Sequence, residues 1–306
     1  MINLLFIAAD TSNSLDKNFY FLEKELAKLT NLTIWRKSGR IDNILNKITT
    51  KPDYILLLND IGSQMFPIIK GLFSINIPIG LIVNDVHRFT ESRRHYIRKN
   101  NIQHIFSIVR DKFHEIYPEY KSKMEWFPHF VNTKVCKDYG LKKDINLLMI
   151  GAVNNFYPVR QKILQAYKED PEFIYHHHPG YRNFKKDEEN QIYIDEKYAK
   201  EINRSKIFFT CPSILNYPVK KYFQVLACKS LLLAPTFKEL EDLGFIPDNH
   251  FISINEYNFK EKATYYLANE TERKKIIEEG YRFIHYTHSI KIRAQQLVNK
   301  IENTLS

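Results

Sequence analysis

The sequence predicts an α/β fold made of two Rossmann-like, doubly wound domains that face a central cleft, and three observations support this. Short apolar runs alternate with longer amphipathic segments along most of the 306 residues, as in parallel sheets whose strands are joined by helices. A polar connection at 131–143 interrupts this alternation, which then starts again. The length also suits two domains of roughly 150 residues each.

The individual elements follow from the apolar runs and the helical spacing. In the first half we expect strands at 3–9, 32–37, 53–59, 77–84 and 104–109, a short strand at 123–130, and helices such as 19–29 and 42–48. In the second half we expect strands at 144–152, 172–178, 206–212, 230–235 and 250–255, with helices at 159–168, 196–204, from Pro218 onward and at 237–243. Residues 259–305 are expected to be nearly all helical.

This pattern predicts three parts of the chain. Residues 1–135 form an N-terminal Rossmann-like domain, residues 136–285 a second one, and residues 286–306 a C-terminal helix that can cross back to the first. The three cysteines are far apart and form no C-x-x-C pair, so we expect neither a disulfide framework nor a zinc ribbon, and a reducing, cytoplasmic setting. The first apolar run lacks a basic flank, so it is expected to be a buried strand rather than a signal peptide.

The chain is basic, with a formal net charge of +10. Such an excess suits nucleic acid, the phosphates of a small ligand, or an anionic membrane surface, and it can also be no more than solvated lysine. Because no apolar run is long enough to span a membrane, any membrane contact would be peripheral.

Ligands of open α/β sheets bind where loops leave the carboxyl ends of the strands, so a site is expected in these loops. After the first strand come Asp10, Thr11, Ser12 and Asn13, small polar residues that can contact a sugar or phosphate. The alternative is that Thr11 or Ser14 caps the following helix.

Two further strand ends in the sequence carry histidine. Asp85 and His87 follow the strand at 77–84, where they could act as acid, base or orienting groups or could be structural. His176 and His178 share one face of the strand at 172–178, but no third ligand is spaced to complete a metal site. We therefore expect His178, which precedes Pro179, to lie at the rim of a ligand site rather than on a metal.

Two segments of the second half suggest a diphosphate site. In GAVNNFYPVR (151–160), a glycine and a polar loop follow a strand, and Arg160 lies in the first turns of the next helix, which suits a diphosphate; the alternative is an ordinary exposed arginine. In NYPVKKYFQ (216–224), Lys221 and Gln224 share a helical face, so the lysine could neutralise a phosphate while Gln224 bonds ribose hydroxyls.

Five ordered motifs resemble those of the CgeB-like (spore maturation protein type) glycosyltransferases of the GT-B superfamily. They read G-x-x-N-x-x-Y-P-x-R (151–160), S-x-I-x-x-x-x-P (205–212), K-K-Y-F-Q-V-L-A-C-K (220–229), E-L-E-D-L-G-F (239–245) and H-Y-T-H-S-I-K-I-R-A (285–294). The resemblance spans most of residues 78–300. It implies metal-independent, retaining transfer of a sugar from a nucleotide-diphosphate donor in the C-terminal domain to an acceptor held mainly by the N-terminal domain.

The residues and the resemblance together give a set of expected site residues. The catalytic candidates are His87, Asp85, Arg160 and Lys221. The donor-binding candidates are Gly151, Asn154, Tyr157, His178, Ser213, Tyr217, Lys220 and Gln224, and the acceptor-side candidates are Asp10, Thr11, Ser12 and Asn13. No metal or other cofactor is expected, since no D-x-D stands at a strand end.

The chain departs from the family pattern at three positions. Lys221 replaces an arginine, Gln224 a glutamate and Lys229 a glycine. These changes leave open a nucleotide-sugar binding protein without turnover. A nucleic-acid-binding protein is a third class, but the lysines are scattered rather than clustered with aromatics, so no nucleic acid is expected. The expected partners are a UDP- or GDP-linked sugar and a glycan, protein or small-molecule acceptor, for a cytoplasmic protein that can dock at an anionic membrane.

Overall fold

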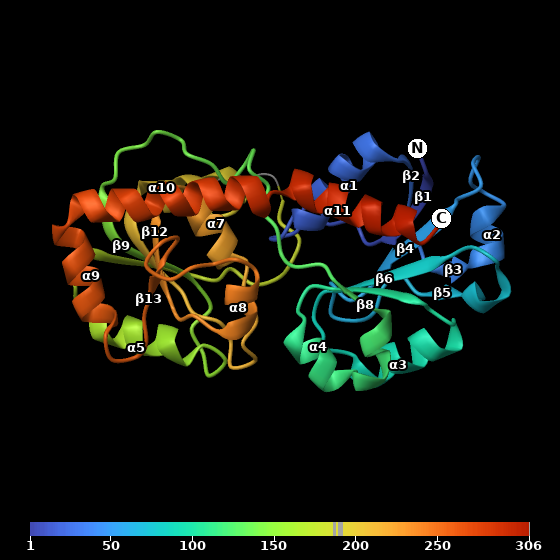
Figure 1. Ribbon diagram of the computed structural model, residues 1–306, viewed down its shortest axis with the longest axis horizontal. Helices are drawn as coiled ribbons and strands as arrows, with labels where there is room; N and C mark the ends of the chain where they lie inside the picture. The colour runs from blue at the N-terminus through green and yellow to red at the C-terminus, as the bar shows by residue number, and fades with distance from the viewer. Residues whose placement is uncertain (186–187, 189–191, 306) are drawn as a thin grey trace. The chain divides into compact units, whose positions relative to one another are not determined.

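The computed structural model describes residues 1–185, 188 and 192–305, and the chain forms two compact units (Figure 1). The N-terminal unit comprises Met1–Ser12, Phe19–Pro128 and Arg293–Ser306, and the C-terminal unit comprises Asn13–Asn18 and His129–Ile292. The sequence placed the domain changes at 135 and 285, whereas the units change at Pro128 and Ile292.

The N-terminal unit is built on a six-stranded parallel sheet with strand order β2-β1-β4-β6-β7-β8. Its central strands are apolar on both faces because helices cover both sides, and β1, β4 and β6 are buried along almost their whole length. The strands are β1 (Asn3–Ala8), β2 (Asn31–Trp35), β4 (Tyr54–Leu58), β6 (Ile79–Val83), β7 (His104–Ser107) and β8 (Met124–Trp126).

Helices cover both faces of this sheet, and Figure 1 shows α1 and α11 on one side of it and α3 and α4 on the other. A separate two-stranded ladder pairs β3 with β5. The elements are α1 (Asn18–Leu29), β3 (Gly39–Arg40), α2 (Ile41–Leu45), β5 (Ile69–Lys70), the 3₁₀ helix η1 (Leu72–Ser74), α3 (Thr90–Lys99), α4 (Asp111–Ile116), the 3₁₀ helix η2 (Pro118–Lys123) and α11 (Ile290–Asn303).

The C-terminal unit contains a five-stranded parallel sheet with strand order β10-β9-β11-β12-β13. Its strands are β9 (Ile145–Gly151), β10 (Phe173–His177), β11 (Ser205–Phe209), β12 (Leu231–Ala234) and β13 (Ile252–Ser253). Its helices are α5 (Pro158–Tyr167), α6 (Asp195–Arg204), α7 (Lys221–Ala227), α8 (Lys238–Asp242), α9 (Phe259–Ala268) and α10 (Glu270–Thr287).

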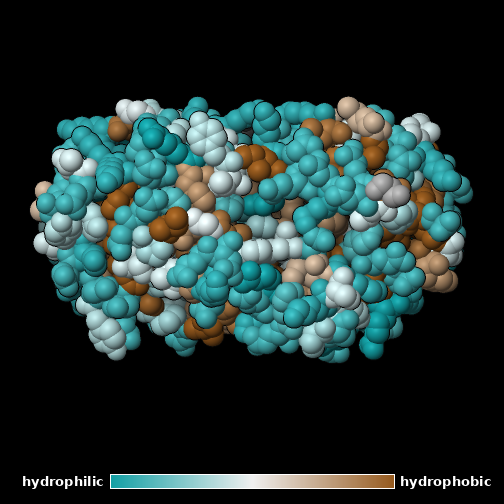
Figure 2. Space-filling model, in the orientation of Figure 1, coloured by the Kyte–Doolittle hydropathy of each residue, from teal (hydrophilic) through white to brown (hydrophobic). Residues whose placement is uncertain are grey.

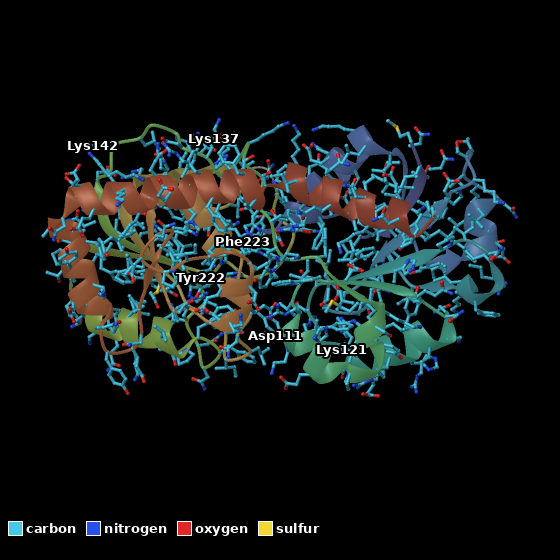
Figure 3. All side chains as sticks on the ribbon, in the orientation of Figure 1. Asp111, Lys121, Lys137, Lys142, Tyr222 and Phe223 are labelled. Carbon is cyan, nitrogen blue, oxygen red and sulfur yellow. The ribbon has the colours of Figure 1, made fainter. Side chains whose placement is uncertain are left out.

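Two hydrophobic clusters form the core of the C-terminal unit, and α7 belongs to one of them. Tyr222 and Phe223 of α7 are fully buried, and Figure 3 shows them among the interior side chains of this unit. Tyr222 also donates a hydrogen bond to the carbonyl of Pro235 at 2.5 Å. The apolar face of α7 is therefore core.

The predicted fold class is confirmed, with two parallel sheets flanked by helices in the expected chain order. One predicted boundary is wrong in a way that matters for the site. The helix expected from Pro218 begins at Lys221, because Asn216 has a left-handed backbone (φ 52°) and the chain reaches the helix through a turn. The helix has only seven residues, so its side chains rather than its amino end must supply charge there.

Polar and charged residues dominate the face of the molecule in Figure 2, and apolar side chains are scattered among them. Among the residues that the structure describes, no helix is both long enough and apolar enough to cross a bilayer.

Candidate functional site

Three loops of the C-terminal unit leave the carboxyl ends of neighbouring strands. They follow β9, β10 and β11, which are adjacent in the sheet. All eight predicted donor-binding residues lie at the end of β9, in these loops or on α7. The loops after β9 and β11 are tied directly, because the amide of Ile214 donates to the carbonyl of Phe156 at 2.9 Å.

Gly151, the last residue of β9, lets two cationic side chains approach the strand end. Its φ of +139° is one that side chains other than glycine rarely adopt, and a Cβ here would lie 3.1 Å from Nζ of Lys221 and 3.4 Å from Nη1 of Arg160. Arg160 and Lys221 therefore meet at one point beside the backbone of the strand.

Arg160 is buried, with 2% of its surface exposed, so the alternative of an ordinary exposed arginine is wrong. Its guanidinium donates to the carbonyls of Ala152 and Cys211 and to the hydroxyl of Thr210, at 3.0–3.1 Å. It also stacks 3.9 Å from the ring centre of Tyr157. Within the described residues all these partners are neutral, so the positive charge of Arg160 has no carboxylate to compensate it and attracts an anion.

Lys221, the first residue of α7, is half-buried beside Arg160. Within the described part of the chain, its ammonium forms no hydrogen bond or ion pair. Burial, together with the charges of Arg160 and Lys220, lowers the pKa of Lys221 to about 7. An anion bound at this point would favour the charged lysine and raise that pKa again.

The neighbouring Lys220 differs from Lys221 in having an acidic partner. Its ammonium forms an ion pair with Asp16, and both side chains are about a quarter exposed. Burial lowers the pKa of Lys220 to about 7, and the ion pair with Asp16 favours its charged form.

Gln224 lies one turn beyond Lys220 and is oriented by a tyrosine. The hydroxyl of Tyr198 on α6 donates to Oε1 of Gln224 at 3.2 Å. Ser213 is buried and accepts a hydrogen bond from the amide of Leu215, so its hydroxyl shapes the loop before α7. Asn154 plays a similar part in the β9 loop, accepting from the amide of Phe156, and Tyr217 is half-buried.

The two histidines that share a strand face have different surroundings. The ring of His176 stacks on Tyr193 at 3.9 Å, and its Nε2 lies 2.9 Å from Glu201, which makes it part of the α6 packing. His178 is half-buried; burial and the charges of Lys221, His177 and Arg160 lower its pKa to about 4. His178 is therefore neutral near pH 7 and within electrostatic range of the Arg160–Lys221 site.

The predicted acceptor-side residues divide between the two units. Thr11 is buried and accepts a hydrogen bond from the amide of Tyr20, so it supports α1, as the capping alternative predicts. Asp10 accepts from the amide of Ser12, which lowers the pKa of Asp10. Asn13 belongs to the C-terminal unit, where its carbonyl accepts from the amide of Phe184.

Asp85 and His87 lie at the carboxyl end of β6 in the N-terminal unit, so the four catalytic candidates divide equally between the units. Loss of hydration lowers the pKa of His87, while the nearby Asp85 carboxylate opposes this. Arg93 stabilises the backbone of this segment by donating hydrogen bonds to the carbonyls of Asp85, Val86 and Arg88.

Arg93 itself is held by a buried acid that the sequence did not reveal. Arg93 and Asp60 are each about 1% exposed and form an ion pair of 2.8 Å. The same carboxylate oxygen of Asp60 accepts from the amides of Asn84 and Asp85, so one buried group holds the end of β6 from several directions.

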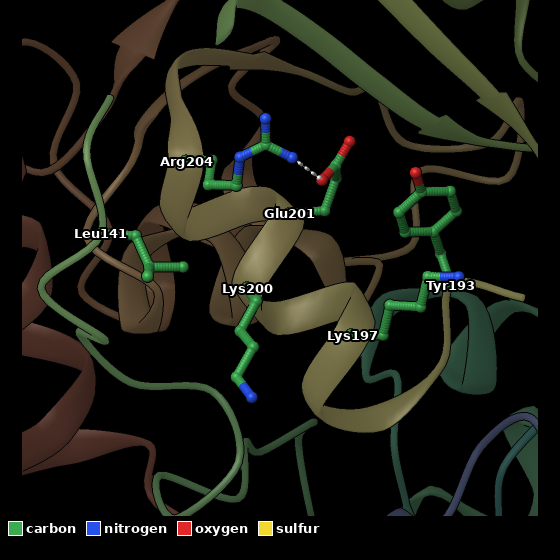
Figure 4. Close-up of a pocket in the computed structure, with 6 residues that line it drawn as sticks. All are labelled: Leu141, Tyr193, Lys197, Lys200, Glu201 and Arg204. Carbon is green, nitrogen blue, oxygen red and sulfur yellow. Dashed lines mark hydrogen bonds and ion pairs between the residues drawn. The ribbon is translucent and has the colours of Figure 1, made fainter. Parts of the chain in front are cut away.

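A hollow of about 440 Å³ lies on the outer side of α6 (Figure 4). Four of its lining residues come from α6, and the lining set is Leu141, Tyr193, Lys197, Lys200, Glu201 and Arg204. Arg204 pairs with Glu201 and Asp144 at 2.9 Å each, and Lys200 pairs with Glu196 at 3.2 Å. With these charges already paired, the hollow has less to offer an anion than the site at Gly151.

Lys229, where the family pattern has glycine, lies at the end of α7 rather than in the site. Its backbone is left-handed (φ 58°), the conformation that favours glycine after a helix. Its ammonium lies 3.1 Å from Glu278 and 3.3 Å from Asp138. The substitution thus strains a helix end and adds two ion pairs there.

Several contacts of the site could not be read from the sequence. Thr210 and the carbonyl of Cys211 hold Arg160, Tyr198 orients Gln224, and Asp16 holds Lys220. Thr210 and Cys211 lie in the motif at 205–212 and Asp16 lies shortly after the polar residues that follow the first strand, but none of them was predicted as a site residue.

Comparison with known proteins shows similarity in part of the sequence and in the fold. Residues 160–299 match the family described as glycosyl transferase-like. Over 99% of this chain, the structure is similar to that of HepE from Anabaena in complex with UDP-glucose, with a TM-score of 0.64, 5% identity and 100% of that chain covered. The chain has the GT-B fold.

Two other GT-B structures are similar over nearly the whole chain. Sucrose-phosphate synthase from Thermosynechococcus elongatus gives a TM-score of 0.66 at 10% identity, over 99% of both chains. A glycosyltransferase from Rickettsia africae gives 0.63 at 9% identity, over 100% of this chain and 99% of that one. No curated protein matches the chain. At such low identities the similarity establishes the GT-B fold, and the activity has to be argued from the site.

Proposed function

We propose that this protein is a glycosyltransferase that takes a sugar from a nucleoside-diphosphate donor, UDP- or GDP-linked, bound by the C-terminal unit. The observation that carries the proposal is the meeting of Arg160 and Lys221 at Gly151. Two cationic groups that have no carboxylate partner among the described residues, at the carboxyl ends of parallel strands, suit a diphosphate. HepE, whose structure is similar, was solved in complex with UDP-glucose, which supports a donor of this class.

The proposed reaction breaks the bond between the anomeric carbon of the sugar and the diphosphate oxygen. A new bond forms from that carbon to an acceptor hydroxyl, whose proton leaves to a base or to the departing phosphate. Arg160 and Lys221 would stabilise the negative charge that develops on the diphosphate. On this proposal the N-terminal unit contributes the acceptor side, with neutral His87 as the candidate base and Asp85 as its orienting partner.

The finer features of the proposal rest on the motif resemblance. They are membership of the CgeB-like group, retention of configuration, independence of a metal, and a glycan, protein or small molecule as acceptor. A cytoplasmic location rests on the three widely spaced cysteines, and docking at an anionic membrane rests on the net charge of +10. Failure of the protein to bind anionic liposomes at low salt would rule out this docking.

A second candidate is a GT-B protein that binds a nucleotide sugar without turning it over. Gln224 favours it, because an amide held by Tyr198 replaces the carboxylate that the resemblance leads one to expect for the ribose hydroxyls. Lys229 favours neither the transferase nor the binding protein, because it lies at the end of α7 and not in the site.

The test begins with thermal-shift screening of the intact chain against UDP, GDP, CDP and their sugars. A ligand at a hundred times its Kd stabilises the fold by about 2.7 kcal/mol, which corresponds to a rise in Tm of roughly 4 °C or more. Ligands that raise Tm are then assayed for transfer and for hydrolysis of the sugar.

Lys221→Ala separates the two candidates when compared with wild type in both assays. Turnover by wild type that is lost in the variant supports the transferase, whereas binding without turnover of any donor supports the binding protein. If no nucleotide or nucleotide sugar raises Tm, the proposed donor site is wrong. Lys229→Ala serves as the matched control, since it removes a lysine just beyond the opposite end of α7 without touching the site.

A further inference from the structure

The segment Asn13–Asn18, called the strap below, belongs to the C-terminal unit although the residues on both sides of it belong to the N-terminal unit. Ser14 forms an antiparallel bridge with Asn183 and donates to its side chain at 2.9 Å. The amide of Phe184 donates to the carbonyl of Asn13 at 2.8 Å. These bonds fix the strap beside the loop that follows β10.

Two ion pairs add to these contacts, and they have different consequences. Lys17 pairs with Asp195, at the start of α6. Asp16 pairs with Lys220, the residue directly before Lys221. The first pair only attaches the strap, whereas the second removes a positive charge from the neighbourhood of the Arg160–Lys221 site.

The Asp16–Lys220 ion pair affects the charge that an anion bound at Lys221 experiences. The charge of Lys220 acts on the Lys221 ammonium and lowers its pKa, so the two lysines share one electrostatic environment. An anion near Lys221 is therefore attracted by Lys220 and repelled by Asp16, because opposite charges attract and like charges repel across this distance. Both groups of the Asp16–Lys220 pair are about a quarter exposed, so they can separate without leaving a charge fully buried.

We propose that Asp16 is an internal competitor for the diphosphate site: its carboxylate holds the ammonium of Lys220 in the free protein and releases it to the diphosphate of a bound ligand. The inference rests on the proposed donor site and assigns Lys220 as its third cation. This competition sets a lower limit on the negative charge of a ligand that can bind, since only a ligand with enough negative charge displaces the Asp16 carboxylate from Lys220.

Asp16 also has a local role that must be separated from this one. Its Oδ1 accepts a hydrogen bond from the amide of Asn18, at the start of α1. Asp16→Asn keeps a side-chain oxygen for that bond while it removes the charge, so the variant tests the charge alone. Asp195→Asn is the matched control, because it breaks the other ion pair of the strap without changing the charge beside Lys220.

The experiment measures binding of inorganic pyrophosphate, which reports on the anion site whatever sugar or base the protein prefers. In calorimetric titrations at low salt, we expect Asp16→Asn to bind pyrophosphate about 3- to 5-fold more tightly than wild type, the size of one partly screened charge. Asp195→Asn should bind as wild type does. Adding Lys220→Met to Asp16→Asn should abolish the gain.

Each outcome decides the matter. Equal affinities for wild type and Asp16→Asn, or no binding by either, overturn the inference. A gain shared by Asp195→Asn also overturns it, since loosening of the strap would then be the cause. A gain confined to Asp16→Asn supports the inference even if no nucleotide sugar is bound or transferred, in which case the proposed function alone is wrong.

Discussion

The lowered pKa of Lys221 leads to a prediction about how ligand affinity depends on pH. Burial and the neighbouring charges of Arg160 and Lys220 bring this pKa to about 7, so the free protein loses the Lys221 proton as the pH rises through neutrality. A bound diphosphate stabilises the charged lysine, which raises its pKa in the complex. Binding must then take up a proton above pH 7, and affinity must fall as pH rises.

The size of the effect follows from the protonated fraction. For a pKa of about 7, roughly 75% of Lys221 is charged at pH 6.5 and about 3% at pH 8.5, so the Kd should rise about 25-fold between these values if the lysine stays charged in the complex. Of the other groups nearby, Lys220 is the one whose pKa burial also lowers to about 7, but its ion pair with Asp16 favours the charged form in the free protein. His178 and Cys211 do not titrate in this range. The pKa of His178 is lowered to about 4, and burial raises that of the Cys211 thiol.

The assay is calorimetric titration with UDP-glucose at pH 6.5, 7.5 and 8.5, in two buffers of different ionisation enthalpy. UDP-glucose is chosen because its diphosphate has no free terminal phosphate to titrate near neutrality. The buffer comparison gives the number of protons taken up directly, which should approach one at pH 8.5.

Two variants make the prediction refutable. Lys221→Arg keeps a charge at every pH in the range, so it should give a flat profile, and Lys221→Met should bind weakly with a profile flatter than that of wild type. A wild-type profile as flat as that of Lys221→Arg, with no proton uptake, would refute the proposed titration of Lys221. A steep profile retained in Lys221→Met would assign the titration to another group.

Three further predictions concern stability, each measured by urea unfolding. Arg160→Ala should lower the free energy of unfolding by about 2–4 kcal/mol, because the Thr210 hydroxyl and two carbonyls lose a buried partner; a loss below 1 kcal/mol would mean that these bonds are not maintained. Lys229→Gly should be more stable than Lys229→Ala by about 1 kcal/mol, since both lose the ion pairs but only glycine relieves the left-handed backbone, and equal stabilities would count against a strained helix end. Arg93→Met should cost about 3–5 kcal/mol by leaving Asp60 buried without its partner, and a near-neutral result would show that Asp60 becomes protonated at little cost.

Much of the fold could be predicted because it depends on local patterns. The strands at 3–9, 53–59 and 144–152 were recognisable as apolar runs, since strands buried on both faces need apolar residues at every position. The start of α7 was misplaced because the Pro218 signal is local, whereas the backbone of Asn216 postpones the helix. Short elements such as β3 and β5 carry too few residues for a recognisable period.

The two sheet-forming halves, the loops at their strand ends and the cationic residues in those loops follow from the amino-acid sequence. What those residues contact depends on the folded chain: Arg160 is buried against the end of β11, Lys221 lies beside it at Gly151, and Asp16 pairs with Lys220. The difference arises from the sequence distance over which each feature is set. Strand and helix patterns arise from residues a few positions apart, whereas an ion pair or a shifted pKa depends on groups that folding brings together from distant parts of the chain.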